Sequence, residues 1–290
     1  MERKEKEMID IVLPYVNNND RVWQKTYINY CVDRGYINKI TAMRGNRFDD
    51  NNMFEYLFKG IEKFMPFVNR VFLLVSNIEQ VPAFIKRHKK VKVVLHREFI
   101  YSQYLPTFNS TTIEMFLWNI KELGEYFIYA NDDMLPFKEL KEEDFFTEDG
   151  KIKIEWWEED IRQVRTVFRI QCINSHHHLL NRFGIKHDSW HYIRPAHSMT
   201  PMIKSHCVQA YLAIKPLIEK HIRAFRTEYQ YNQYIYPIYE KIKYGTCDSN
   251  IDFLYTQFKD GIDLDHQIVC LNVVPRKLEK DIIAEIEKRL

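Results

Sequence analysis

The sequence predicts an α/β protein: a Rossmann-like, mostly parallel sheet flanked by helices, with a helical insertion in the second half. Three observations predict this fold. Apolar strand patterns alternate with helical patterns over residues 9–130, which is typical of a parallel sheet. Hydrophobic residues make up 46% of the chain, enough for a large core. Gly and Pro number only 8 and 10 in 290 residues, which excludes low-complexity and collagen-like chains.

Four apolar runs predict the buried strands, and they lie at 9–16, 70–76, 91–95 and 125–130. Helical spacing predicts a helix over 50–65 that ends at Pro66, and Pro82 opens a short helix over 81–88. A further helix is expected over 110–122, with Ser110 as its N-cap.

The second half has weaker periodicity. Helical patterns cover 160–184 and 199–222, a strand at 269–274 is expected to return to the same sheet, and an amphipathic helix covers 276–290. We expect one domain over 1–290, with an α/β part at 1–137, a helical part at 138–265, and the return strand and terminal helix at 266–290. The Tyr-rich stretch 229–244 is either core or a surface that faces a sugar.

Charge and cysteine content restrict the class of protein. The 42 Lys and Arg nearly balance the 40 Asp and Glu, so no nucleic-acid partner is expected. Five Cys without a CxxC pair predict reduced thiols in the cytoplasm. No apolar run reaches 18 residues, and the short run after the charged start contains Asp10, so neither a membrane span nor a signal peptide is expected. The terminal helix is either packed or a peripheral membrane contact.

The strongest chemical signal is Asn131-Asp132-Asp133, which follows a strand. Ligands bind beyond the carboxyl ends of parallel strands, and adjacent carboxylates suit Mg²⁺ or Mn²⁺. A turn or helix cap is the alternative. Glu114 precedes this strand on a helix, and its proximity to Asp133 requires a distortion of the regular α/β order.

Four basic or histidine-containing features are weaker signals. His197, in an irregular segment, is an acid or base candidate or a surface side chain. Arg226 and Arg47 are each a phosphate clamp or an ordinary charge. The tract His176-His177-His178 is unsuited to one ion because adjacent helical residues point in different directions. The usual motifs of dinucleotide dehydrogenases, P-loop kinases, α/β-hydrolases and zincins are absent from the sequence.

Ordered blocks of the chain resemble the Stealth family of sugar-1-phosphate transferases, which includes bacterial capsular polysaccharide phosphotransferases and the GlcNAc-1-phosphotransferase α/β subunit. The first block is IDIVLPYVNNNDRVW at 9–23. The second comprises RFDDN at 47–51, LPTFNSTTIE at 105–114 and FIYANDD at 127–133. The third is Pro195-Ala196-His197 followed by Phe225-Arg226, and the fourth is Cys270-Leu271-Asn272-Val273.

The resemblance implies a reaction in which a UDP-sugar donates its sugar-1-phosphate to a hydroxyl of a surface or capsular polysaccharide, and UMP leaves. It implies that Asp133, His197 and Arg226 are catalytic, with His197 as the base. Asp10, Arg47, Asn109 and Asn272 are then donor-binding candidates, Asn109 with a structural role as the alternative. Glu114, Asp132 and Asp133 are the implied metal ligands.

The fourth block departs from the family pattern because Val273 stands in place of an Asp. Either fewer protein ligands hold the ion, or Asp263 or Asp265 substitutes, or activity is reduced. Two alternatives to phosphotransfer are a nucleotide-sugar glycosyltransferase and an inactive nucleotide-sugar-binding relative. The expected location is the cytoplasm, including the inner face of the membrane. The sugar, the acceptor and the oligomeric state are not predicted.

Overall fold

The computed structural model describes residues 8–43, 53–86, 88–256, 258, 261–272, 274–275 and 277–290. Its main sheet has five strands and confirms the predicted α/β class. In spatial order these are β3 (Val91–Leu95), β2 (Val68–Val75), β1 (Ile9–Pro14), β4 (Tyr126–Tyr129) and β8 (Thr200–Ile203). The first four run parallel, and β8 pairs antiparallel with β4.

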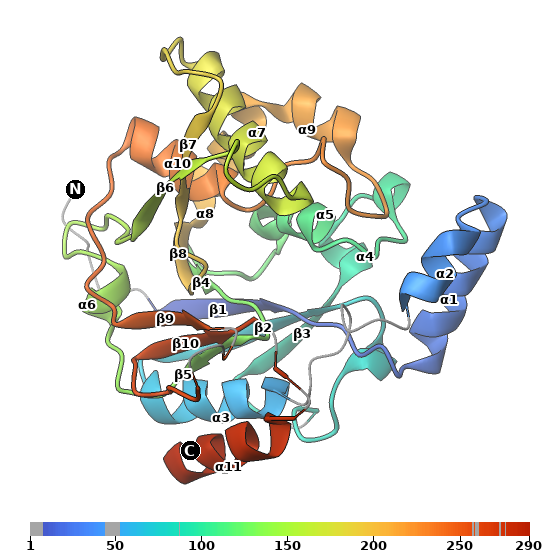
Figure 1. Ribbon diagram of the computed structural model, residues 1–290, viewed down its shortest axis with the longest axis vertical. Coiled ribbons are helices and arrows are strands. Elements are labelled where there is room, and N and C mark those ends of the chain that lie inside the picture. The colour runs from blue at the N-terminus through green and yellow to red at the C-terminus, as the bar shows by residue number, and fades with distance from the viewer. Residues whose placement is uncertain are drawn as a thin grey trace.

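Both faces of this sheet are covered, because the strands carry apolar side chains on both sides. Along β1, Ile11 and Leu13 enter one core while Val12 enters the other. The first core lies against α3 (Met53–Phe64) and α11 (Glu279–Arg289), which lie together on one side of the sheet (Figure 1).

Most of the remaining helices cover the opposite face or lie above it (Figure 1). These are α4 (His96–Phe99), α5 (Ser110–Glu114), α7 (Val167–Arg182), α8 (Lys204–Ala213), α9 (Lys215–His221) and α10 (Ile235–Lys243). Beyond the carboxyl end of β1, α1 (Arg21–Asp33) and α2 (Ile37–Met43) lie to one side. The short elements are α6 (Glu142–Phe145) and 3₁₀ turns at 78–80, 102–104 and 117–119.

The return strand does not enter the main sheet, contrary to prediction. Instead β10 (Ile268–Leu271) lies between β5 (Met134–Pro136) and β9 (Phe253–Thr256) in a separate three-stranded sheet. The antiparallel β8 occupies the edge beside β4. An apolar strand is compatible with any buried sheet edge, so its sequence alone does not select a neighbour.

Four helix predictions also need correction. The pattern over 199–222 begins with strand β8 (Thr200–Ile203), and its helices begin at Lys204. Residues 82–86 form turns rather than a helix. The helix expected over 110–122 ends at Glu114, and the chain continues through a 3₁₀ turn at 117–119. The helical pattern predicted over 160–184 overlaps the last residue of strand β6 (Trp156–Asp160). This strand pairs with β7 (His191–Pro195) and forms a separate two-stranded ribbon. The part at 138–265 therefore contains strands as well as helices.

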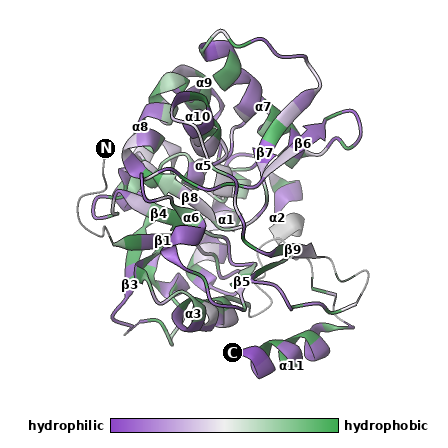
Figure 2. Cartoon of the chain, turned by 90° about the vertical axis from the view of Figure 1, so that its left-hand side faces the viewer, coloured by the Kyte–Doolittle hydropathy of each residue, from purple (hydrophilic) through white to green (hydrophobic). Residues whose placement is uncertain are grey.

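The two open interpretations of the aromatic and terminal segments are decided by burial. Tyr231, Tyr234, Tyr236 and Tyr239 are buried, so the Tyr-rich stretch is mainly core. In α11, Ile282 and Ile286 are fully buried beside α3, while the helix also carries hydrophilic residues (Figure 2). Every helix in the described part of the chain is too short or too polar to cross a bilayer.

Candidate functional site

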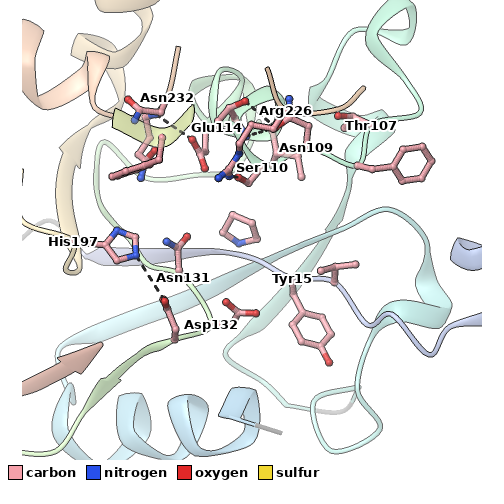
Figure 3. Close-up of a pocket in the computed structure, with 18 of the residues that line it drawn as sticks. Tyr15, Thr107, Asn109, Ser110, Glu114, Asn131, Asp132, His197, Arg226 and Asn232 are labelled. Carbon is pink, nitrogen blue, oxygen red and sulfur yellow. Dashed lines mark hydrogen bonds and ion pairs between the residues drawn. The ribbon is translucent and has the colours of Figure 1, made fainter. Parts of the chain in front are cut away.

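A cavity of about 900 Å³ opens at the carboxyl edge of the main sheet. The chain reaches it directly after β1 and β4, where Tyr15 and Asn131-Asp132-Asp133 line its wall. Segments from the second half close the opposite side with His197 and Arg226 (Figure 3). The volume lies within the range of small-molecule sites and suits a ligand of nucleotide-sugar size.

Asp133 and His197 lie side by side in the cavity wall, at ion-pair distance. The Nε2 of His197 lies 3.8 Å from Oδ2 of Asp133, and its Nδ1 lies 3.4 Å from the hydroxyl of Tyr234. The Cys270 thiol donates to the same Asp133 oxygen at 3.3 Å. Burial raises the pKa of Asp133, but the hydrogen bond and positive charge of His197 outweigh it and leave that pKa below its ordinary value.

The backbone explains why these three groups meet. Asp133 directly precedes β5, and β5 pairs with β10, which carries Cys270. The backbone N–H of Leu271 donates to the carbonyl of Asp133 at 2.8 Å, which fixes the two segments together. The fourth block of the sequence therefore reaches the site through this small sheet, although it lies far away along the chain.

The site includes a carboxylate oxygen that has no partner. Oδ1 of Asp133 is buried and forms no hydrogen bond with any described residue. Such an atom is a candidate ligand for a cation, because a buried anionic oxygen is unfavourable without a compensating partner. Asp133, His197 and Cys270 are the single cluster of acidic, His or Cys groups in the described ranges whose ligand atoms all lie within 4.8 Å of one another.

Glu114 lines the cavity but is not part of that cluster, and neither is Asp132, so the metal roles of both residues stay predictions. Glu114 is only 4% exposed, and its two oxygens accept from the Tyr129 hydroxyl and the Gln233 backbone N–H, each at 3.2 Å. Burial raises the pKa of Glu114, and the nearby positive charge of Arg226 partly opposes this. From the sequence, Glu114 can lie near Asp133 only if the regular α/β order is distorted. The distortion is that α5 ends at Glu114, after which the chain continues to the start of β4.

Arg226 lies beside Glu114 and lines the cavity (Figure 3). One of its terminal nitrogens donates to the Ser110 hydroxyl, while its Nε is buried without a partner in the described structure. The Glu114 carboxylate and Ser110 therefore orient a guanidinium that retains an unused donor. A guanidinium with free donors is suited to an anionic ligand such as phosphate.

Asn109 has a mainly structural position. Its side chain caps α5 by accepting from the Thr111 backbone N–H, and its amide donates to the Gln230 side chain at 3.0 Å and to the Arg223 carbonyl at 3.1 Å. These contacts join the 105–114 block to the loop that carries Arg226. These contacts support the structural alternative, while Asn109 also lines the cavity, so its donor-binding role stays a prediction.

Asp10 is not in the cavity, contrary to prediction. It lies at the amino end of β1, is 0% exposed, and accepts hydrogen bonds from Asn69, Arg70 and the Gly124 backbone. The prediction of donor binding is wrong for geometric reasons, because the cavity is at the other end of the strand. Asp263 and Asp265 also lie outside the cavity lining and bind His266 and Lys138.

Other predicted positions have simpler outcomes. Asp132 and Asn272 both line the cavity. Arg47 and Val273 lie outside the described residues. His177 packs on His187 with ring centroids 4.0 Å apart and binds the His191 carbonyl, so the histidine tract makes local contacts. All five cysteines are free thiols, in agreement with the prediction.

A charged wall on the β6–β7 ribbon and the start of α7 was missed from the sequence. Glu159 forms ion pairs with both Arg194, at 2.6 Å, and Arg169. The guanidinium of Arg194 also lies 4.6 Å from the centre of the Trp157 ring. All four side chains line the cavity. The two arginines leave one positive charge in excess over Glu159. No strand was predicted at 156–160 or 191–195, so no local pattern indicated this wall.

Part of this chain matches the model of a known family. Residues 47–154 match the family model described as Stealth protein CR2, conserved region 2. That segment contains Asn109, Glu114, Asp132 and Asp133. The chain thus carries this Stealth region, and the resemblance identified from the sequence motifs is confirmed.

Three similar proteins are capsular polysaccharide phosphotransferases. One from Actinobacillus suis is 36% identical over 159 residues, covering 54% of this chain and 42% of the relative. WcwK from Streptococcus pneumoniae is 38% identical over 139 residues, covering 48% and 41%. LcbA from Neisseria meningitidis is 36% identical over 144 residues, covering 49% and 38%. The matched part thus spans about two fifths of each relative.

Proposed function

Because the chain carries a Stealth conserved region, we propose that it transfers a sugar-1-phosphate from a UDP-sugar to a hydroxyl of a surface or capsular polysaccharide. The acceptor oxygen forms a bond to the phosphorus that bears the sugar. The bond from that phosphorus to the bridging oxygen breaks, and UMP leaves with this oxygen. The product is a phosphodiester.

One geometric feature supports the proposal most strongly: Asp133, with its unpartnered oxygen, faces His197 at the carboxyl edge of a parallel sheet. In this proposal the neutral His197 accepts the proton of the acceptor hydroxyl on Nε2, and the Asp133 carboxylate, 3.8 Å from that nitrogen, stabilises the resulting positive charge. Arg226 binds the phosphate that is transferred, and Glu114 positions Arg226. Arg169 and Arg194 add positive charge on the facing wall.

A divalent cation is part of the proposal. Asp133 and Asp132 would hold Mg²⁺ or Mn²⁺, which favour oxygen ligands and commonly retain water. When bound, the ion would neutralise negative charge on the diphosphate. The location of the enzyme at the inner face of a membrane is also a proposal.

The first test identifies the nucleotide product. The protein is incubated with a panel of UDP-sugars, a polysaccharide acceptor and Mn²⁺ or Mg²⁺, and nucleotides are separated by chromatography. We expect UMP, loss of turnover in a chelator, and recovery when the metal is returned. UDP as product would instead establish glycosyl transfer, and nucleotide binding without turnover would establish an inactive relative.

The matched variants are His197→Gln and His88→Gln. His88 lies outside the cavity and pairs with Glu62 at 2.6 Å on the surface, so its substitution controls for the loss of a histidine. General acid–base catalysis contributes about 10²- to 10⁴-fold, so UMP release should fall by roughly that factor in His197→Gln alone. Equal activity in the two variants would contradict the assignment of His197.

A further inference from the structure

The cavity has two chemically different halves. The charged half contains acidic and basic side chains: Glu114, Asp132, Asp133, Glu159, Arg169, Arg194, His197 and Arg226. The neutral half contains aromatic and uncharged polar side chains: Tyr15, Trp23, Ser76, His96, Thr107 and Phe108. In Figure 3, His197 lies on one side of the cavity and Tyr15 and Thr107 lie on the other, with Asp132 between His197 and Tyr15 and with Arg226 beside Thr107 at the boundary of the two halves. The proposed reaction uses the charged half and leaves the neutral half without a role.

His96 is the most informative residue of the neutral half. It follows β3 directly and is only 6% exposed, although its ring forms part of the cavity wall. Its Nε2 is buried and has no hydrogen-bond partner among the described residues. Burial lowers the pKa of His96 to about 4, so the imidazole is neutral at physiological pH. A neutral imidazole offers one hydrogen-bond donor and one acceptor without a charge.

Thr107 shows the same property independently. Its side chain is 3% exposed and lines the cavity, and its hydroxyl is buried without a partner in the described ranges. The backbone there is fixed, because the next residue, Phe108, donates its N–H to the Ala224 carbonyl at 2.9 Å. Buried polar groups nearly always have partners in folded proteins, so two unpartnered groups that line one cavity point to a ligand that supplies them.

The chemistry of these groups selects the part of the donor that they bind. Guanidinium groups bind phosphate oxygens, and these groups belong to the charged half. Neutral donors and acceptors beside aromatic rings suit a flat, uncharged group that carries hydroxyls, carbonyls and N–H. Trp23 and Phe108 provide such rings, packed edge to face with centroids 5.8 Å apart. The place, beyond the carboxyl ends of β1 to β3, is also where parallel sheets bind nucleotides.

We propose that the neutral half binds the uridine of the UDP-sugar, and that His96 and Thr107 hydrogen-bond its ribose or base and determine specificity for it. This inference rests on the proposed function, because it takes a UDP-sugar as the ligand. The donor then lies across the cavity, with uridine in the neutral half and the diphosphate and sugar in the charged half. His96 and Thr107 act on donor affinity, whereas His197 acts on turnover.

The test compares UDP with inorganic pyrophosphate as probes. Their dissociation constants are measured by calorimetry with Mg²⁺ for wild type, His96→Phe, Thr107→Val, His96→Gln and the surface control His88→Phe. The loss of one neutral hydrogen bond should weaken UDP binding by about tenfold in His96→Phe and Thr107→Val. Pyrophosphate binding should change by less than about twofold, His96→Gln should retain part of the UDP affinity, and His88→Phe should resemble wild type.

The outcomes separate the inference from the proposed function. Unchanged UDP binding in both His96→Phe and Thr107→Val, with UMP still released by wild type, would overturn the uridine site and leave the proposed function standing. An equal loss of UDP and pyrophosphate affinity would also overturn it, because the residues would then serve the diphosphate. A wild-type protein that neither binds UDP nor releases UMP would refute the proposed function itself. Thr107→Val is nearly isosteric, so it keeps the test decisive if His96→Phe folds poorly.

Discussion

Each end of the main sheet holds a carboxylate, the buried Asp10 and the half-buried Asp133, and the two side chains have opposite surroundings. At the amino end, both oxygens of Asp10 accept hydrogen bonds, from Arg70, Asn69 and the Gly124 backbone. At the carboxyl end, one oxygen of Asp133 faces His197 and Cys270 while the other is unpartnered beside a large cavity. A carboxylate at a strand end is therefore not by itself a site, and the unmet hydrogen-bonding capacity distinguishes the two positions.

The largest expected effect is on turnover at the carboxyl end. Asp133→Asn keeps the shape of the side chain but removes the negative charge that stabilises a protonated His197 and would hold an ion. We expect UMP release to fall by about 10³-fold while the thermal midpoint changes little, because removing one preorganised electrostatic partner typically has this effect on a rate. Initial rates and thermal unfolding of the same preparation measure both quantities. A variant with near-wild-type rates would contradict the functional difference between Asp133 and Asp10.

A smaller effect, on stability alone, is expected at the amino end. Asp10→Asn leaves the Arg70 guanidinium without its charged partner, so the free energy of unfolding should fall by about 3 kcal/mol. The kcat of the folded variant should equal that of wild type, because the site is at the opposite end of β1. Urea unfolding and active-site-normalised rates test this, and a selective loss of UDP binding would restore Asp10 as a donor-binding residue.

The smallest effect concerns acid sensitivity at the carboxyl end. The folded pKa of His96, about 4, lies below the ordinary 6.5, so the unfolded chain binds more protons and stability falls as the pH drops between those values. From pH 7 to pH 5 this amounts to roughly 2 kcal/mol. His96→Phe should therefore lose about that much less stability than wild type over the same interval.

Urea unfolding at the two pH values measures this difference. His176, whose pKa is also lowered to about 4 by burial, contributes equally to both proteins and cancels in the comparison. Identical pH dependence in wild type and His96→Phe would mean that His96 is solvated in solution, which would weaken the contrast between a closed amino end and a cavity at the carboxyl end.

The features that the sequence predicted correctly depend on residues that are close together in the chain. Strand β3 has the predicted bounds of 91–95, and β1, β2 and β4 differ from prediction by only one or two residues at their ends, because continuous apolar runs between turns specify buried strands. The site residues Asp133, His197 and Arg226 were found through ordered motifs, and the structure places all three around one cavity. The reaction they support remains a proposal.

The part that could not be predicted depends on contacts between distant segments. Asp10 and Asp133 are both carboxylates next to a buried apolar strand. Only their hydrogen-bond partners in the folded chain show which of the two faces a cavity. Glu114 was assigned to metal, yet folding gives its oxygens to Tyr129 and Gln233. The wall of Glu159, Arg169 and Arg194 exists only because β6 pairs with β7 and α7 packs beside them.

The sequence by itself determined the α/β class and the core strands, and it singled out the three side chains proposed to be catalytic, since these follow from local periodicity and motif order. Only the tertiary structure decided which oxygen of Asp133 is left without a hydrogen-bond partner among the described residues, and that His96 and Thr107 are buried in the lining of the same cavity. The physical reason is that desolvation and hydrogen-bond satisfaction are set by neighbours that are distant in the chain, and no local pattern specifies those neighbours.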